Sequence, residues 1–136
     1  MADPRAFISF DVDYNSNEKV LFEKNIKHSK TPFTIQDCST EPSKPRSKWE
    51  AIVNEKIDKC NLVIVLVGKY MSSATGVAKE ITSAHSQDVP VFGIYVGGAD
   101  NSSKLPNGLQ RNRTITWNWD SIASVIEQAM EEKKNI

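Results

Sequence analysis

The sequence predicts a doubly wound α/β fold, with a five-stranded parallel sheet in the order 2-1-3-4-5 and helices on both faces. Short β-prone runs alternate with amphipathic helical stripes along the whole chain. The run 62–67, Leu-Val-Ile-Val-Leu-Val, is unbroken and apolar, as is typical of a central parallel strand covered on both faces. With 136 residues, no repeat and no linker, we expect a single domain over residues 1–136.

The amino-terminal part provides two strands and one helix. Residues 6–10 form a β-prone run that ends at a turn-forming, acidic cluster, residues 11–17. Residues 18–30 have a helical pattern, with Leu21 among the inward-facing positions. Residues 33–36 are a second short strand, followed by a polar, proline-containing loop.

Two further helices flank the central strand. Ser47-Lys-Trp-Glu50 fits a capping box, in which Ser47 and Glu50 satisfy backbone donors at the start of a helix. After the central strand, residues 68–76 form a loop. The next helix has an inward stripe made of Val77, Ile81 and Ala84.

The carboxyl-terminal part completes the alternation. Residues 90–96 are a strand, and residues 97–112 form a long loop, rich in Gly, Asn and Ser, which we expect to be the most mobile segment. Residues 113–117 are the last strand. Asp120 can cap the final helix.

In such a sheet, ligands bind at the carboxyl ends of the strands, beside the first and third strands. The chemistry is therefore expected in three loops, over residues 11–17, 37–45 and 68–76.

The composition excludes several classes of function. Seventeen basic and seventeen acidic residues give no net charge, which excludes the basic excess of a nucleic-acid binder or a polybasic membrane tether. The longest apolar run is too short to cross a bilayer. Two cysteines form no disulfide framework, and neither they nor the two histidines have metal-ligand spacing. We see no leader sequence and expect a cytoplasmic protein with reduced thiols and no metal.

The sequence does not contain the residues that several other functions of this kind of sheet require. A phosphate-accepting receiver needs an aspartate after the third strand, where this chain has Gly68 and Lys69. The loop after the first strand is not a Ser/Thr/Gly-rich phosphate cradle. P-loop and dinucleotide-binding glycine motifs are also absent.

Glu80 is the most informative residue. It follows a serine-rich loop in the first turns of a helix, where the positive helix end is expected to keep a carboxylate ionised beside the cleft. There it could stabilise an oxocarbenium-like transition state and promote cleavage of an N-glycosidic bond. The alternative is structural, because acidic residues are common in first turns for the sake of the dipole alone.

Four segments together carry a resemblance to a known family. They are Arg5-Ala-Phe-Ile-Ser-Phe-Asp11, Ile57-Asp-Lys-Cys-Asn-Leu-Val-Ile-Val-Leu-Val-Gly68, Lys69-Tyr-Met-Ser-Ser-Ala-Thr-Gly-Val-Ala-Lys-Glu-Ile81 and Pro90-Val-Phe-Gly-Ile94. In this combination the chain resembles the TIR domain, in particular the compact prokaryotic branch that includes Thoeris ThsB-type proteins. The resemblance covers nearly the whole chain and implies a flavodoxin-like sheet.

The resemblance assigns roles to residues. In TIR enzymes that cleave NAD+, a glutamate at the start of the third helix is catalytic, and Glu80 matches it. The loop after the first strand lines the nucleotide site, which implies Ser9, Phe10 and Asp11 as substrate-binding residues. Whether Phe10 stacks on nicotinamide or belongs to the core stays open.

The other two loops contribute as well. The loop after the second strand, which begins at Asp37, would gate the site or mediate assembly. Ser72 and Ser73 would face the ribose beside the glutamate. Gly76 belongs to the same expected site, but many TIR proteins have a tryptophan there, four residues before the glutamate.

The function implied is an NAD+ glycohydrolase or cyclase that releases nicotinamide and makes an ADP-ribose-derived signal for a separate effector in anti-phage defence. NAD+ is then the substrate and no cofactor is needed; self-association through TIR surfaces is expected, and no nucleic acid or membrane partner. Two alternatives stay open: a non-catalytic TIR-like interaction module, and an enzyme similar to the nucleoside deoxyribosyltransferases.

Overall fold

The computed structural model describes residues 5–10, 20–21, 36–37, 46–69, 75–106 and 108–132. Its parallel sheet has the strand order β2-β1-β3-β4-β5. The strands are β1 (Arg5–Ser9), β2 (Gln36–Asp37), β3 (Leu62–Val67), β4 (Val91–Tyr95) and β5 (Thr114–Ile115). The predicted α/β class, a parallel sheet flanked by helices, is confirmed.

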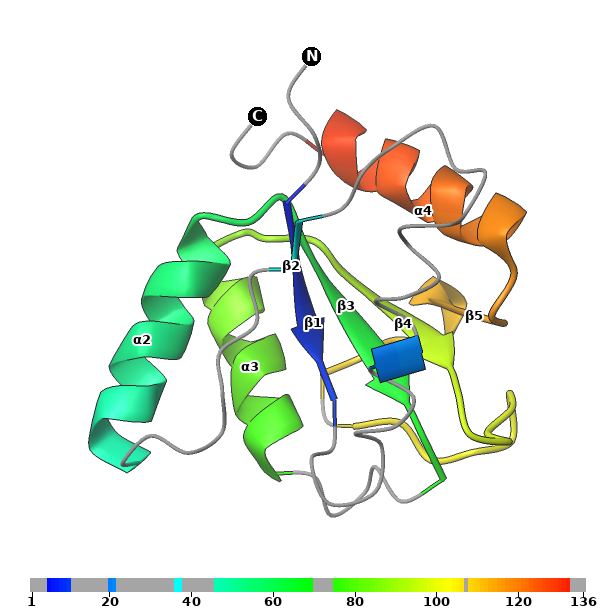
Figure 1. Cartoon of the computed structure of the whole chain (residues 1–136), viewed down its shortest axis with the longest axis horizontal. Helices are drawn as coiled ribbons and strands as arrows, with labels where there is room; N and C mark the ends of the chain where they lie inside the picture. Colours follow the sequence, from blue (N-terminus) through cyan, green and yellow to red (C-terminus); the bar gives the residue numbers. More distant parts are fainter. Residues whose placement is uncertain are drawn as a thin grey trace.

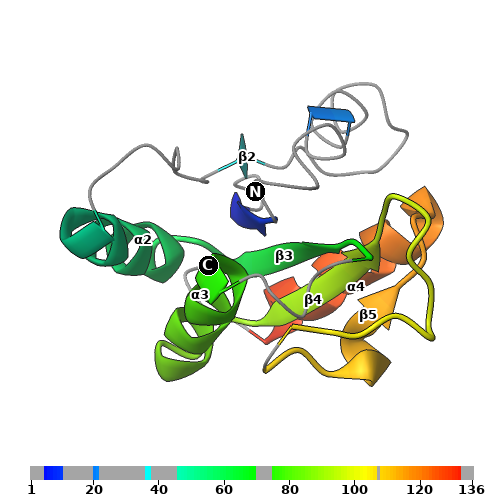
Figure 2. The same cartoon turned by 90° about the horizontal axis from the view of Figure 1, so that it is seen from below.

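Three longer helices cover the sheet: α2 (Arg46–Asp58), α3 (Thr75–Ser86) and α4 (Trp119–Glu131). Figure 1 shows α2 and α3, in green, together on one side of the sheet, and α4, in orange and red, on the other. Figure 2, turned by 90°, shows the same division. Both faces of the central strand are therefore buried, as its unbroken apolar sequence requires.

Side chains alternate between two cores, one on each face of the sheet. In β3, Val63 and Val65 belong to the core under α2 and α3. Leu62, Ile64 and Leu66 belong to the core under α4. All five side chains are at most 1% exposed, so β3 anchors both layers.

The ends or faces of three helices differ from the predictions. Helix α2 begins at Arg46, so Ser47 lies inside it, and the predicted capping box is wrong. The cap of α4 is Asn118, which accepts hydrogen bonds from the backbone N–H groups of Asp120 at 2.9 Å and Ser121 at 3.3 Å. Asp120 lies in the first turn instead, where its charge complements the helix dipole. In the predicted first helix, which lies mostly outside the described residues, Leu21 is 53% exposed and does not face inward.

The long connection between β4 and β5 carries its own set of hydrogen bonds. Arg111 donates to the backbone oxygens of Ser103, at 2.9 Å, and of Asn101. It also donates to the hydroxyl of Tyr95 at 3.4 Å, which ties the loop to the end of β4. Leu109 is buried in the α2–α3 core. These contacts, which the composition of the segment did not reveal, hold a loop that was predicted to be mobile.

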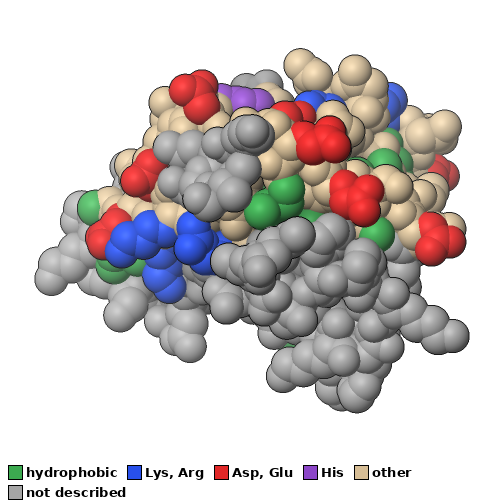
Figure 3. Space-filling view, turned by 90° about the horizontal axis from the view of Figure 1, so that it is seen from above, with side chains coloured by type: hydrophobic (Ala, Val, Ile, Leu, Met, Phe, Trp, Pro, Cys, Tyr) green, Lys and Arg blue, Asp and Glu red, His purple; other side chains and the backbone are tan. Residues whose placement is uncertain are grey.

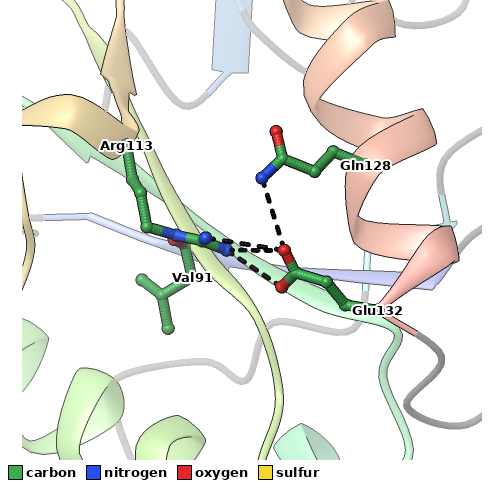
Figure 4. A network of polar contacts seen from close by, with 4 residues as sticks. All are labelled: Val91, Arg113, Gln128 and Glu132. Carbon is green, nitrogen blue, oxygen red and sulfur yellow. Dashed lines mark hydrogen bonds and ion pairs between the residues drawn. The ribbon is translucent and has the colours of Figure 1, made fainter.

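A second network joins the last strands to α4, at the amino ends of the strands. Arg113 donates from Nε to the Val91 backbone oxygen at 3.0 Å and from Nη2 to Glu132 Oε1 at 3.1 Å (Figure 4). Its guanidinium carbon lies 4.0 Å from the centre of the Phe92 ring. Gln128 also donates to Glu132, at 3.4 Å. The network therefore links the start of β4 to the end of α4 through the side chain of Arg113.

Candidate functional site

A buried pair of polar side chains lies where β1 meets α3. Ser9, the last residue of β1, donates a hydrogen bond from Oγ to Oε1 of Glu80 at 2.6 Å. Ser9 is fully buried and Glu80 is 8% exposed. The two residues are 71 positions apart in sequence, so the pair exists only because α3 crosses this end of the sheet.

Strand alternation puts Ser9 under α3. Ser9 lies two residues after Phe7, which belongs to the core beneath α2 and α3, so both side chains are on the same face of β1. Ser9 is paired with Val65, in the central strand. The strands run downward in Figure 1, so their carboxyl ends and the amino end of α3 share the lower edge. This is the edge at which such sheets bind ligands.

Glu80 belongs to the inward stripe of α3. The buried residues Val77, Ile81 and Ala84 stand three positions before, one after and four after it. Residues spaced in this way share one face of a helix. Helix α3 has no acidic residue in its first turn, and Glu80 is its sixth residue. The structural alternative, a surface acid at a helix end, therefore does not describe this residue.

Burial controls the charge of the carboxyl group. It raises the pKa of Glu80 from 4.5 to about 7, while the hydrogen bond from Ser9 acts in the opposite direction. The expectation that the helix end keeps Glu80 ionised is wrong, because the dipole acts mainly within the first turn. Near neutral pH this group exchanges a proton readily, a property common in catalytic acids and bases.

The structure also places two of the other predicted binding residues, Phe10 directly after β1 and Asp37 within β2. Phe10 packs, half-buried, against the core under α4, on the other face of the sheet from Ser9. Asp37, in β2, is in register with Ala6, three residues before Ser9 along the neighbouring strand. The structure thus places Phe10 away from Glu80, and for Asp37 it gives the position in the strand alone.

Gly76 is close to the pair in sequence and lies in the first turn of α3, not in a preceding loop as predicted. It lies one helical turn before Glu80, where a glycine has no aromatic side chain to pack against a substrate. Asp11, Ser72 and Ser73 lie outside the described residues.

A groove of about 390 Å³ lies at the opposite end of the sheet from this pair. Its walls include His85 and Asp88 near the end of α3, Val91 at the start of β4, and the Arg113–Glu132 ion pair. Figure 3 views the molecule from this end and shows hydrophobic side chains, in green, interrupted by acidic ones, in red. No local sequence pattern revealed this groove, because its residues come from three separate segments, within 85–91, within 108–113 and at residue 132.

The described residues contain no group of three or more His, Cys, Asp or Glu side chains that could hold a metal ion. Within the same part of the chain, no helix is long and apolar enough to cross a membrane.

The protein is thus a parallel α/β domain with a buried acid, Glu80, near the carboxyl ends of its strands. In fold, the chain is similar to the crystal structure of a prokaryotic SEFIR domain, with a TM-score of 0.51 at 13% identity. That match covers 96% of this chain and 92% of the SEFIR chain. No curated protein sequence matches the chain.

The family itself follows from the sequence. The family model for the TIR-like domain of Thoeris protein ThsB matches residues 7–101, well over half of the chain. The protein therefore belongs to the Thoeris ThsB family of TIR-like domains, and the resemblance seen in its motifs is confirmed. Ser9 and Glu80 both fall within the matched region.

Proposed function

We propose that this protein is an NAD+ glycohydrolase or ADP-ribosyl cyclase in which Glu80 is the catalytic residue. The observation that carries the proposal is the burial of Glu80 against Ser9 at the ligand-binding edge of the sheet. A carboxyl group in an apolar helix stripe lowers stability unless something compensates for its burial. Its presence there is typical of a functional site, and membership of a TIR-like family supports NAD+ as the substrate.

The proposed reaction breaks the N-glycosidic bond between nicotinamide and ribose. The bonding electron pair leaves with nicotinamide, and positive charge develops on the ribosyl ring. The ionised carboxylate of Glu80 stabilises this charge, and a poorly hydrated site strengthens that interaction. Water then captures the ribosyl cation to give ADP-ribose, or a nucleophile within the same molecule captures it to give a cyclic product. Such a product would act as the signal for a separate effector in anti-phage defence.

The test is nicotinamide release from NAD+, with chromatography of all products. We expect release by the unaltered protein and none by Glu80→Gln, because the amide keeps the shape of the side chain and removes its charge. Glu127→Gln is the matched control, since Glu127 is an exposed acid on α4 and should be dispensable. Equal turnover by the Glu80→Gln and Glu127→Gln variants would exclude Glu80 as the catalytic residue.

A second candidate is a non-catalytic interaction module that acts through self-association. Gly76 favours it, because the position one turn before Glu80 has no aromatic side chain to pack against a substrate. The same assay separates the two functions. A module would release no nicotinamide at any protein concentration, whereas an enzyme whose site is completed by a neighbouring copy would gain specific activity as concentration rises.

A further inference from the structure

The serine of the pair is a poor candidate for a substrate contact. Ser9 is fully buried, and its hydroxyl points to the carboxyl group of Glu80. The distance of 2.6 Å is in the range of a short hydrogen bond from a hydroxyl to a carboxylate. Because this hydroxyl is buried and donates its hydrogen bond to Glu80, we expect it to influence the orientation and ionisation of that carboxyl group.

We propose that Ser9 is a positioning residue, which binds one carboxylate oxygen of Glu80 and leaves the other oxygen for the ribosyl cation. The inference rests on the proposed function, and it changes the role assigned to Ser9 from substrate binding to control of the catalytic group. A glutamate has three rotatable side-chain bonds, so a fixed partner removes alternative orientations before substrate arrives.

The same hydrogen bond influences the proton on Glu80. A hydroxyl that donates to a carboxylate favours the ionised form, and burial favours the neutral form. Both effects are present here, and burial is the larger, so the pKa of Glu80 rises to about 7. Loss of the Ser9 hydroxyl would leave burial unopposed and would raise the pKa further.

Other ionisable groups belong to the same layer of the molecule as the pair. Those whose side chains the structure describes on the elements of this layer are Arg5 of β1, Glu55, Lys56 and Asp58 of α2, Lys79 and His85 of α3, and Tyr95 of β4. The central strand β3 has no ionisable side chain. Within the described part of the chain, the causes of the shift at Glu80 are burial and the Ser9 hydroxyl.

The first experiment measures the proton on Glu80 without any substrate. The side-chain carboxyl carbon of Glu80 is followed by NMR from pH 5 to pH 9 in glutamate-labelled protein, and Glu80→Gln identifies its signal. We expect the titration midpoint to move upward in Ser9→Ala and to stay near that of the unaltered protein in Ser9→Thr, which keeps the hydroxyl. Ser9→Cys fills the site with a weak donor and should also move upward, which keeps the test available if the alanine variant does not fold.

The second experiment measures the kinetics. At pH 7 we expect Ser9→Ala to release nicotinamide with a kcat roughly tenfold lower, in line with the strength of hydrogen bonds to charged groups, and with little change in the KM for NAD+. The kcat should recover toward higher pH. A direct substrate contact would instead raise KM at every pH.

An unchanged titration midpoint in Ser9→Ala would overturn the proposal, as would a rise in KM with no change in kcat. Failure of the unaltered protein to release nicotinamide would overturn the proposed function. The titration needs no NAD+, so it would still decide whether Ser9 controls the proton on Glu80.

Discussion

Ser9 and Glu80 share a buried hydrogen bond of 2.6 Å that joins the end of the first strand to the second turn of α3. The pair lies on the face of the sheet covered by α2 and α3, among side chains that are otherwise mostly apolar. A polar pair in such surroundings is costly to bury unless its hydrogen bond compensates for the loss of water. Glu80 of this pair is the residue that we propose to be catalytic.

The rate of NAD+ cleavage should depend on pH near neutrality. Glu80 has a pKa of about 7, and the proposed mechanism needs its ionised form. We therefore expect kcat/KM, which reports ionisation of the free enzyme, to rise between pH 6 and pH 8, with a midpoint near 7, in nicotinamide-release assays at NAD+ concentrations well below KM. Circular dichroism across the same range controls for unfolding. A kcat/KM that is constant over this interval would mean that Glu80 does not act as the carboxylate.

Glu80 should also reduce stability at higher pH. Its pKa is higher in the folded protein than the ordinary value of 4.5, so the folded state binds the proton more tightly. The stability associated with this group is complete below pH 4.5 and is lost as the pH rises to about 7.

We expect Glu80→Gln to be more stable than the unaltered protein at pH 8, and to gain roughly 2–3 kcal/mol more there than at pH 5. Urea unfolding at the two pH values measures the difference, and effects of other titrating groups largely cancel between the two proteins. A gain that is the same at both pH values would show that the pKa of Glu80 is not raised in the folded state.

Gly93 makes room for the side chain that anchors the β4–β5 loop. A Cβ at this position would lie 2.8 Å from Cδ2 of Leu109 and 3.0 Å from Cγ2 of Thr114. Gly93→Ala should therefore lower the free energy of unfolding by about 1–3 kcal/mol, as overpacked cores do. The cost should shrink in a Leu109→Ala background, where the nearest obstructing atom is gone. Equal costs in both backgrounds would contradict the proposed clash.

The Arg113 network should stabilise the protein mainly through contacts other than its ion pair. The side chains of Arg113 and Glu132 are 26% and 36% exposed, and partly exposed ion pairs contribute little. We expect Glu132→Gln to cost less than about 1 kcal/mol of unfolding free energy. Arg113→Met should cost about 2 kcal/mol, because it also removes the bond to the Val91 backbone oxygen and the contact with the Phe92 ring.

Chemical denaturation measures both variants, and 1 M salt should reduce the cost of Glu132→Gln more than that of Arg113→Met. Similar costs for the two substitutions would assign the stability to the ion pair instead. NAD+ cleavage should be unaffected, since this network lies at the opposite edge of the sheet from Glu80.

The sequence revealed the elements whose patterns are local. The apolar run 62–67 marked the central strand, and the stripe of Val77, Ile81 and Ala84 marked the helix that carries Glu80. Capping was harder to predict, because Ser47 and Asp120 are both common cap residues and the helices begin beside them. The bonds of Arg111 to the β4–β5 loop were also missed, since nothing in the composition of a loop shows which side chain will reach its backbone.

The sequence by itself therefore determined the α/β class and the TIR-like family, and it singled out Glu80 as the candidate catalytic residue. The α/β class depends on spacings of two to four positions, which strands and helices impose directly, whereas the family and the candidate glutamate depend on the resemblance carried by short motifs. Only the tertiary structure decided that Ser9 is the partner of Glu80, that Phe10 turns to the other face, and that burial raises the pKa of Glu80 to about 7. Contact across 71 residues and depth below the surface depend on how a helix crosses a sheet, and local patterns do not contain that information.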